Sequence, residues 1–307
     1  MTASVIIPVT ITDAMLSSTT VPETDFTAWN AATSYTVGTK VMRAVSGVHK
    51  NFQNLIAGVD ATLPENATTG TTPRWLDLGA TNPWAMFDSK VGTVTTVATS
   101  MTVVLRPGAI SGLAFMELVG RTVTVTMKNA PGGTVVYSKT VTLDGTIIGS
   151  FFEWFFNDYV QKTDIILTDL PSQYTSPELT ITISTTSGNV GCGVCTMGKV
   201  VNIGATEYGA TLGITDYSAK TTDTYGNVII TKRAYSKRAN YKLWTAKTDF
   251  TNIFRTLASI RSTPCVYIAT EEDGYEPLVV YGFYKDFSIE VSYPDVHMSS
   301  LEVEGLI

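Results

Sequence analysis

The chain contains the stretch Arg121-Thr-Val-Thr-Val-Thr-Met127, and this stretch decides its fold class. Val123, Val125 and Met127 stand at every second position, with threonines between them. Alternation with a period of two is typical of a β-strand that turns one face to a core and the other to solvent. Leu179-Thr-Ile-Thr-Ile-Ser184 repeats the pattern. We therefore predict two half-buried antiparallel strands.

A cluster of turn-forming residues, Asn129-Ala-Pro-Gly-Gly133, separates the first of these strands from Val135-Val-Tyr-Ser-Lys-Thr-Val141. Asn, Pro and Gly each favour backbone conformations found in tight turns, so the two flanking segments should form a hairpin. Thr and Val are frequent along the whole chain, and β-branched side chains pack well on pleated sheets. The predicted fold class is mainly β.

Two segments have a helical pattern. In residues 249–261, apolar side chains recur at spacings of three and four: Phe250, Ile253, Phe254, Leu257 and Ile260. We predict a helix there, with Asp249 at its N-terminal cap. The second segment, Phe151-Phe-Glu-Trp-Phe-Phe-Asn-Asp-Tyr159, would carry aromatic rings on every face of a helix. Periodicity therefore leaves two alternatives, a short buried helix or a strand followed by a turn.

The chain has 307 residues, more than a single hydrophobic core usually spans, so a multi-domain protein is expected. Shifts in composition divide it into four segments. These are an N-terminal arm over residues 1–27, a small aromatic-rich β module over 28–90, a β-sandwich over 91–200 and a C-terminal β domain with the helix over 201–307. The C-terminal segment is expected to form a β-sandwich-with-helix unit.

Composition limits the classes of partner. Hydrophobic residues make up 44% of the chain and charged residues 16%, which is enough apolar material for folded cores. The net charge is −6 and no run of Lys or Arg exceeds two, so nucleic acid is not expected as a partner. The N-terminus has no secretion-signal pattern, and the apolar run from Ile147 to Phe156 is broken by polar residues and too short to span a bilayer. A soluble protein without membrane insertion is predicted.

Residue types for catalysis are scarce. The two histidines, His49 and His297, stand outside any nucleophile or metal-ligand motif. The acids Glu271-Glu272-Asp273 precede Gly274, and a glycosidase would need two opposed carboxyls across a sugar site. Consecutive acids between strands are more simply explained as a solvated hairpin tip. We predict no enzyme activity, no metal and no cofactor.

Cys192-Gly-Val-Cys195 has the spacing of a redox pair or of half a zinc site. The second half of a zinc site is missing from the sequence, since only Cys265 and two distant histidines remain as ligands. The alternative is a pair of buried cysteines in a glycine-rich strand, which is the interpretation we favour. An odd number of cysteines fits assembly in a reducing cytoplasm.

The aromatic residues of the second segment follow a recognisable order. Trp29 precedes Tyr35-Thr-Val-Gly38 and a Val-rich strand, and an aromatic strand, Pro64 and Trp75 follow. This order resembles the small carbohydrate-binding modules of the chitin- and cellulose-binding type. The continuation from Trp75 to Trp84-Ala-Met-Phe-Asp88, and the entrance over residues 11–23, are similar to segments of tail and baseplate proteins of tailed bacteriophages.

The resemblance implies that exposed aromatic rings stack on sugars. The candidate carbohydrate-binding residues are Trp29, Tyr35, Trp75 and Trp84. The sugar-binding versions often carry Gly-Asp before the Val-rich strand, where this chain has Gly38-Thr39. The alternative is that the tryptophans form the core of a domain too small to fold without large aromatics.

A second resemblance to the same phage proteins covers residues 203–218 and 223–238. It implies that the C-terminal domain belongs to a ring-forming tail protein. Lys232, Arg233, Lys237 and Arg238 are then candidate subunit-interface residues that face an acidic patch of the next subunit. The simpler alternative is a solvated strand edge, where Lys and Arg prevent unwanted pairing. The N-terminal arm is expected to add a strand to a neighbour.

Together these features predict a structural component of a phage tail, distal-tail or hub-like, in the tail-tip or baseplate region. The expected partners are further copies in a symmetric ring, other phage tail proteins and host-surface polysaccharide. The expected location is the virion tail, assembled in the host cytoplasm. Two alternatives remain from other classes: a receptor- or glycan-binding tail protein that contributes to host attachment, and a glycan-degrading enzyme.

Overall fold

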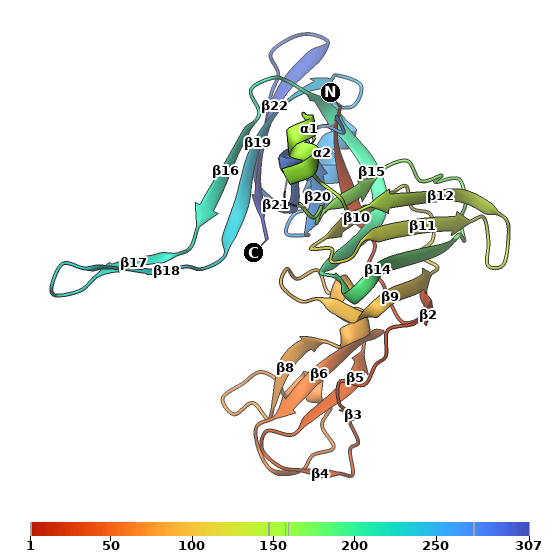
Figure 1. Ribbon diagram of the computed structural model, residues 1–307, viewed down its shortest axis with the longest axis vertical. Coiled ribbons are helices and arrows are strands. Elements are labelled where there is room, and N and C mark those ends of the chain that lie inside the picture. Colours follow the sequence, from red (N-terminus) through yellow and green to blue (C-terminus); the bar gives the residue numbers. More distant parts are fainter. Residues whose placement is uncertain (1, 147, 157, 159, 273, 307) are drawn as a thin grey trace. The chain divides into compact units, whose positions relative to one another are not determined.

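The computed structural model describes residues 2–146, 148–156, 158, 160–272 and 274–306 (Figure 1). The chain is mainly β, as predicted, and its strands form several sheets. It divides into two compact units. Unit 1 consists of Met1–Pro8 and Thr196–Ile307, and unit 2 consists of Val9–Cys195. Unit 2 is therefore an insertion in the sequence of unit 1.

A five-stranded antiparallel sheet lies in unit 2, with the strand order β12-β11-β14-β9-β2. The alternating apolar residues of the two predicted strands are buried and lie opposite one another, as Val125 and Ile181 do. Both strands are thus confirmed. The strands of this sheet are β2 (Leu16–Thr19), β9 (Thr95–Leu105), β11 (Thr122–Lys128), β12 (Val135–Thr142) and β14 (Glu178–Cys192).

Strands β11 and β12 form the predicted hairpin. The Asn129 N–H donates to the Thr134 carbonyl at 3.0 Å, and the Gly133 N–H donates to the Ala130 carbonyl at 2.9 Å. The Asn129 side-chain oxygen also accepts from the Thr134 N–H at 3.0 Å. The turn residues therefore provide the hydrogen bonds that fix the register of the two strands.

The aromatic-rich module of unit 2 contains a four-stranded sheet and a two-stranded sheet. Its core consists of Tyr35, Val41, Phe52 and Trp75. The four-stranded sheet is formed by β3 (Thr27–Ala28), β5 (Lys40–Val45), β6 (Val48–Asn54) and β8 (Trp75–Ala80), and the other by β4 (Ser34–Tyr35) and β7 (Gly58–Val59). Two short 3-10 helices, η1 (Pro64–Ala67) and η2 (Asn82–Phe87), belong to the same part.

Helix α1 (Phe151–Phe156) lies in the connection between β12 and β13 (Ile165–Leu167), and β13 pairs antiparallel with β10 (Gly112–Met116). Of the two alternatives for the aromatic segment, the structure forms the helix. The expectation that this helix is buried is wrong, because all of its residues are exposed. Asn157 and Tyr159 of the segment lie outside the described residues.

Unit 1 is built on a sheet whose strands follow the order β15-β1-β20-β21-β22-β19-β16. The strands are β1 (Thr2–Pro8), β15 (Val194–Thr206), β16 (Thr211–Asp216), β19 (Tyr235–Ala246), β20 (Cys265–Ile268), β21 (Val279–Glu290) and β22 (Val296–Gly305). Between β16 and β19 the chain forms a separate ribbon of β17 (Ala219–Thr222) and β18 (Val228–Thr231), which runs away from the sheet in Figure 1. Unit 1 also contains α2 (Phe250–Ser259) and the 3-10 helix η3 (Glu276–Leu278).

The first strand of the N-terminal arm is already used within its own chain, so strand addition to a neighbour stays a prediction only for the rest of the arm, where β2 lies at the edge of its sheet. Strand β1 pairs antiparallel with β15 on one side and with β20 on the other, and Ala3, Val5 and Ile6 are buried. Strand β2 pairs with β9 of the same chain. A strand that is paired on both sides has no free edge left to add to a neighbouring subunit.

Helix α2 confirms the predicted amphipathic pattern. Ile253 and Leu257 are buried in the core of unit 1, whereas Phe254 is 56% exposed. Asp249 occupies the N-cap position, and its carbonyl accepts from the Ile253 N–H at 2.9 Å. The Asp249 side chain makes no capping bond to the described residues of the first turn. The helix is therefore held mainly by the burial of one face.

The four segments predicted from composition are a finer division than the two units. The boundary predicted near residue 200 lies a few residues after Cys195, where unit 2 ends. The segment over residues 1–27 is divided at Pro8, because its first strand belongs to unit 1 and the rest belongs to unit 2.

Leu257→Ala should lower the free energy of unfolding of unit 1 by about 2–5 kcal/mol, because Leu257 is 1% exposed and its loss leaves a cavity. Phe254→Ala, on the exposed face of the same helix, should change it by only about 0.5 kcal/mol. Urea denaturation followed by circular dichroism measures both. Equal losses in the two variants would contradict the orientation of α2.

Candidate interaction surfaces

Three of the four candidate carbohydrate-binding residues are buried. Tyr35 is 7% exposed, and Trp75 and Trp84 are each 1% exposed. The rings of Tyr35 and Trp75 meet edge to face, with centroids 5.4 Å apart. The Tyr35 hydroxyl accepts from the Asn30 N–H at 2.7 Å and donates to the Asn30 carbonyl at 3.2 Å. These residues hold the module together and present no ring face to a sugar.

Trp29 is the partly exposed member of the set. It packs against the module core, and the Arg43 guanidinium lies over its ring at 5.2 Å from the centroid. Arg43 in turn lies 3.4 Å from a Glu65 carboxylate oxygen. One face of the Trp29 ring is therefore already covered by a cation. The predicted sugar platform is corrected: the four rings do not form a common exposed surface, and the alternative of a small aromatic core describes them.

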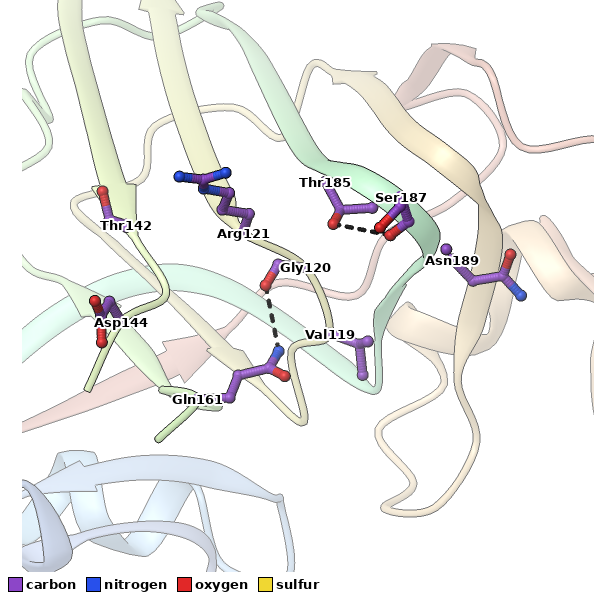
Figure 2. Close-up of a pocket in the computed structure, with 10 residues that line it drawn as sticks. Val119, Gly120, Arg121, Thr142, Asp144, Gln161, Thr185, Ser187 and Asn189 are labelled. Carbon is purple, nitrogen blue, oxygen red and sulfur yellow. Dashed lines mark hydrogen bonds between the residues drawn. The ribbon is translucent and has the colours of Figure 1, made fainter. Parts of the chain in front are cut away.

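A polar pocket of about 530 Å³ lies in unit 2 (Figure 2). Gln161 donates to the Gly120 carbonyl at 3.4 Å and to the Leu118 carbonyl at 3.0 Å. Asp144 accepts from the Thr146 N–H at 3.0 Å, and this bond lowers the pKa of its carboxyl. Asp144 is the one carboxylate among the lining residues that the structure describes. The opposed carboxyl pair of a glycosidase is therefore not present in this pocket.

The other acids and the histidines are also placed apart. Glu271 and Glu272 are exposed in the connection between β20 and β21, as a solvated hairpin tip would be, and Asp273 lies outside the described residues. The His49 Nδ1 atom lies 2.8 Å from a Glu23 carboxylate oxygen in unit 2, whereas His297 is buried in unit 1. Among the described residues, His, Cys, Asp and Glu side chains form no group of three suited to a metal.

The three cysteines are buried, which confirms the favoured interpretation of the Cys-x-x-Cys stretch. Cys192 lies at the end of β14 and Cys195 in β15, and their Sγ atoms are free thiols. Burial raises the pKa of both thiols far above the usual range, and it raises the pKa of Cys265 to about 12. Thiols in this state are poor nucleophiles and poor metal ligands.

The clearest uncovered apolar surface is the ribbon between β16 and β19, residues 217–234. We call this ribbon the arm; it is distinct from the N-terminal arm of residues 1–27. Val228 (64% exposed) and Ile230 (65%) lie on one face of β18, and Ile229 (53%) lies on the other. The arm therefore exposes aliphatic side chains on both faces. A two-stranded ribbon is only marginally stable in water when neither face is covered. The exposed apolar surface continues from the arm onto β16 of the unit 1 sheet, where Ile214 is 68% exposed.

The tip of the arm is a closely hydrogen-bonded turn. The Asp223 carboxylate accepts from the backbone N–H groups of Tyr225 and Asn227, both at 2.8 Å, and from the Asn227 side chain at 3.0 Å. These bonds, that from the Asn227 side chain foremost, lower the pKa of the Asp223 carboxyl. Gly226 takes a positive φ of 87°, which the turn requires. Tyr225 is held at this tip and is 90% exposed.

The predicted interface cations lie at the base of the arm. Lys232 and Arg233 are exposed in the connection from β18 to β19. Arg238 is exposed on β19, between Gly213 and Glu304 of the neighbouring strands, whereas Lys237 is half-buried and lies opposite Ile214. The four cations thus lie together at the base of the arm, next to exposed apolar side chains such as Ile214.

A second exposed surface surrounds α1; we call residues 145–160 the aromatic loop. Its rings are exposed on every side of the helix: Phe151 by 87%, Phe152 by 71%, Trp154 by 62%, Phe155 by 69% and Phe156 by 72%. The rings of the loop also contact one another, and the centroids of Phe152 and Phe156 lie 4.7 Å apart. These contacts cover little of the ring surface. A helix that is apolar all round is normally buried, so this one lacks its cover.

Local hydrogen bonds explain why this segment is helical. The Ser150 Oγ accepts from the Glu153 N–H at 3.2 Å, and the Glu153 carboxylate accepts from the Gly149 N–H at 2.6 Å. This arrangement is close to a capping box, whose sequence signature is Ser-x-x-Glu before an apolar run. Sequence reasoning missed that signal at Ser150-Phe-Phe-Glu153. Gly145, whose N–H donates to the Val160 carbonyl at 2.8 Å, closes the base of the loop.

Comparison with protein-family models gave no match, and comparison with curated proteins gave none either. Within the described part of the chain, every helix is too short or too polar to cross a bilayer. The exposed arm and the exposed aromatic loop are candidate interaction surfaces.

The three native thiols should be unreactive toward Ellman's reagent at pH 8, because burial keeps them protonated and out of reach. All three should react at once in denaturant. Tyr225→Cys supplies the control, since a thiol at this 90% exposed position should react within the mixing time. Rapid labelling of any native cysteine in the folded chain would show that the Cys-x-x-Cys stretch is accessible.

Proposed function

We propose that this chain is a structural subunit of a bacteriophage tail, in the tail-tip or baseplate region, and that it assembles with further copies into a symmetric ring. The sequence resemblance over residues 11–88 and 203–238 supports the choice of the phage tail. The structural observation that supports assembly is the exposure of aliphatic side chains on both faces of the arm.

The exposed aliphatic side chains of the arm lower the stability of an isolated subunit in water. Contiguous apolar surface on a protein usually marks a binding partner, and its burial stabilises a complex by about 25 cal/mol per Å². The hydrogen bonds around Asp223 fix the tip before any partner binds, so little conformational entropy is lost on association. A ribbon that is preformed, apolar and uncovered is a feature of an assembling protein.

The alternative of a glycan-binding tail protein is not supported by its proposed residues. Tyr35, Trp75 and Trp84 are buried, and Arg43 covers Trp29. As such a subunit, the chain lies in the virion tail and contacts other tail proteins. Catalysis forms no part of it.

Val228→Asp combined with Ile230→Asp should keep the chain monomeric, because two charges would be placed on one apolar face of the arm. Sedimentation velocity over a range of concentrations measures this, and the wild-type chain should show a larger closed species. Val135→Asp provides the matched control: Val135 is 55% exposed on β12, and the same change there should leave assembly intact.

A wild-type chain that stays monomeric at high concentration and binds no other tail protein would leave the proposal without support. Density for this chain in a reconstruction of the intact virion is the complementary test. Several copies related by rotation about the tail axis are expected, and single copies along a fibre would contradict the ring.

A further inference from the structure

We propose that the arm of one copy binds the aromatic loop of the next copy, so that subunits join head to tail. This inference rests on the proposed function and names the partner of the arm within it. The two surfaces belong to different units of the chain, and both are uncovered in the single chain.

Charge favours this pairing. The arm carries three cations, Lys220, Lys232 and Arg233, and one anion, Asp223, which gives a net charge of +2. The aromatic loop carries Glu153 and Asp158 and has no Lys or Arg, so its net charge is −2. Complementary charges across an interface raise the association rate and select the correct partner. They also supply the acidic neighbour that was expected for Lys232 and Arg233.

Both surfaces are apolar in character. The arm offers aliphatic side chains on both faces, and the loop offers aromatic rings on all sides of α1. An aromatic side chain buries about 200 Å² when fully covered, so the five exposed rings offer roughly 700 Å². A stable interface needs about 800 Å² on each partner, which the rings together with Ile148 and Val160 of the same loop approach.

The same charges disfavour the other occupants. Arm against arm would bring +2 to +2, and loop against loop would bring −2 to −2. An anionic lipid surface would repel the loop through Glu153 and Asp158. A contact between two different surfaces of the same chain is heterologous, and it generates a ring when the rotation between subunits closes.

The test uses two full-length variants that each destroy one surface. The arm variant is Val228→Asp with Ile230→Asp, and the loop variant is Phe155→Ser with Phe156→Ser. Each alone should be monomeric, with self-association at least about thirtyfold weaker than wild type, the effect of losing an interface hot spot. Mixed in equal amounts, they should form 1:1 dimers and nothing larger, because each pair retains one intact arm and one intact loop.

The outcomes separate the inference from the proposed function. Wild-type assembly that the loop variant retains would overturn the inference alone, and so would a mixture that stays monomeric. Loss of vesicle binding by a loop variant that still assembles would identify lipid as the occupant instead. A wild-type chain that never self-associates would overturn both. Phe254→Ser, which removes an exposed ring of α2, should assemble like wild type.

A second measurement guards against variants that fail to fold. Trp154 is 62% exposed, so its fluorescence should shift to shorter wavelength as the wild-type chain assembles. Trp154→Phe removes this indole, so the shift should be absent from its spectrum under conditions in which sedimentation shows the variant assembled. Assembly of the wild-type chain with no contribution of Trp154 to a shift would show that the loop stays in water, and the inference would fail.

Discussion

The pairing of Pro8 with Gly198 in the ladder between β1 and β15 is the constraint on which this architecture depends. Strand β1 lies between β15 and β20, so it joins the strands that follow residue 196 into one sheet. A side chain at Gly198 would overlap the Ile7 carbonyl, so only glycine allows this approach. Because the chain leaves unit 1 beside the point where it returns, a large insertion can be accommodated without breaking the sheet.

Local patterns predicted local structure well. The alternation in β11 and β14, the turn at Asn129–Gly133 and the apolar stripe of α2 depend on neighbouring residues, and the structure confirms each of them. Strand β1 could not be predicted in the same way, because its partners β15 and β20 stand far along the chain and leave no periodic signal near residue 5. What the sequence could not provide was the set of long-range pairings.

Aromatic content was the least reliable guide to exposure. Hydrophobicity favoured burial for a helix at residues 151–156, and the resemblance to carbohydrate-binding modules implied an exposed Trp75, but the structure exposes α1 and buries Trp75. In the module, large rings are needed because a small domain has few other ways to exclude water. Around α1, the capping by Ser150 and Glu153 makes a helix without a core to receive it. The two candidate surfaces are recognisable only from their exposure in the folded chain, and the sequence indicated only the cations at the base of the arm.

The insertion of unit 2 also has a consequence for the order of synthesis. Strand β1 leaves the ribosome before its two partners, because β15 and β20 are made only after Val9–Cys195 has been translated. At the usual elongation rates this takes roughly 10 to 40 s. Unit 2 can fold completely during that interval, while the apolar strand that carries Val5 and Ile6 waits unpaired. Newly made chains thus pass through a stage in which β1 is an unpaired apolar strand, open to chaperones and to mispairing.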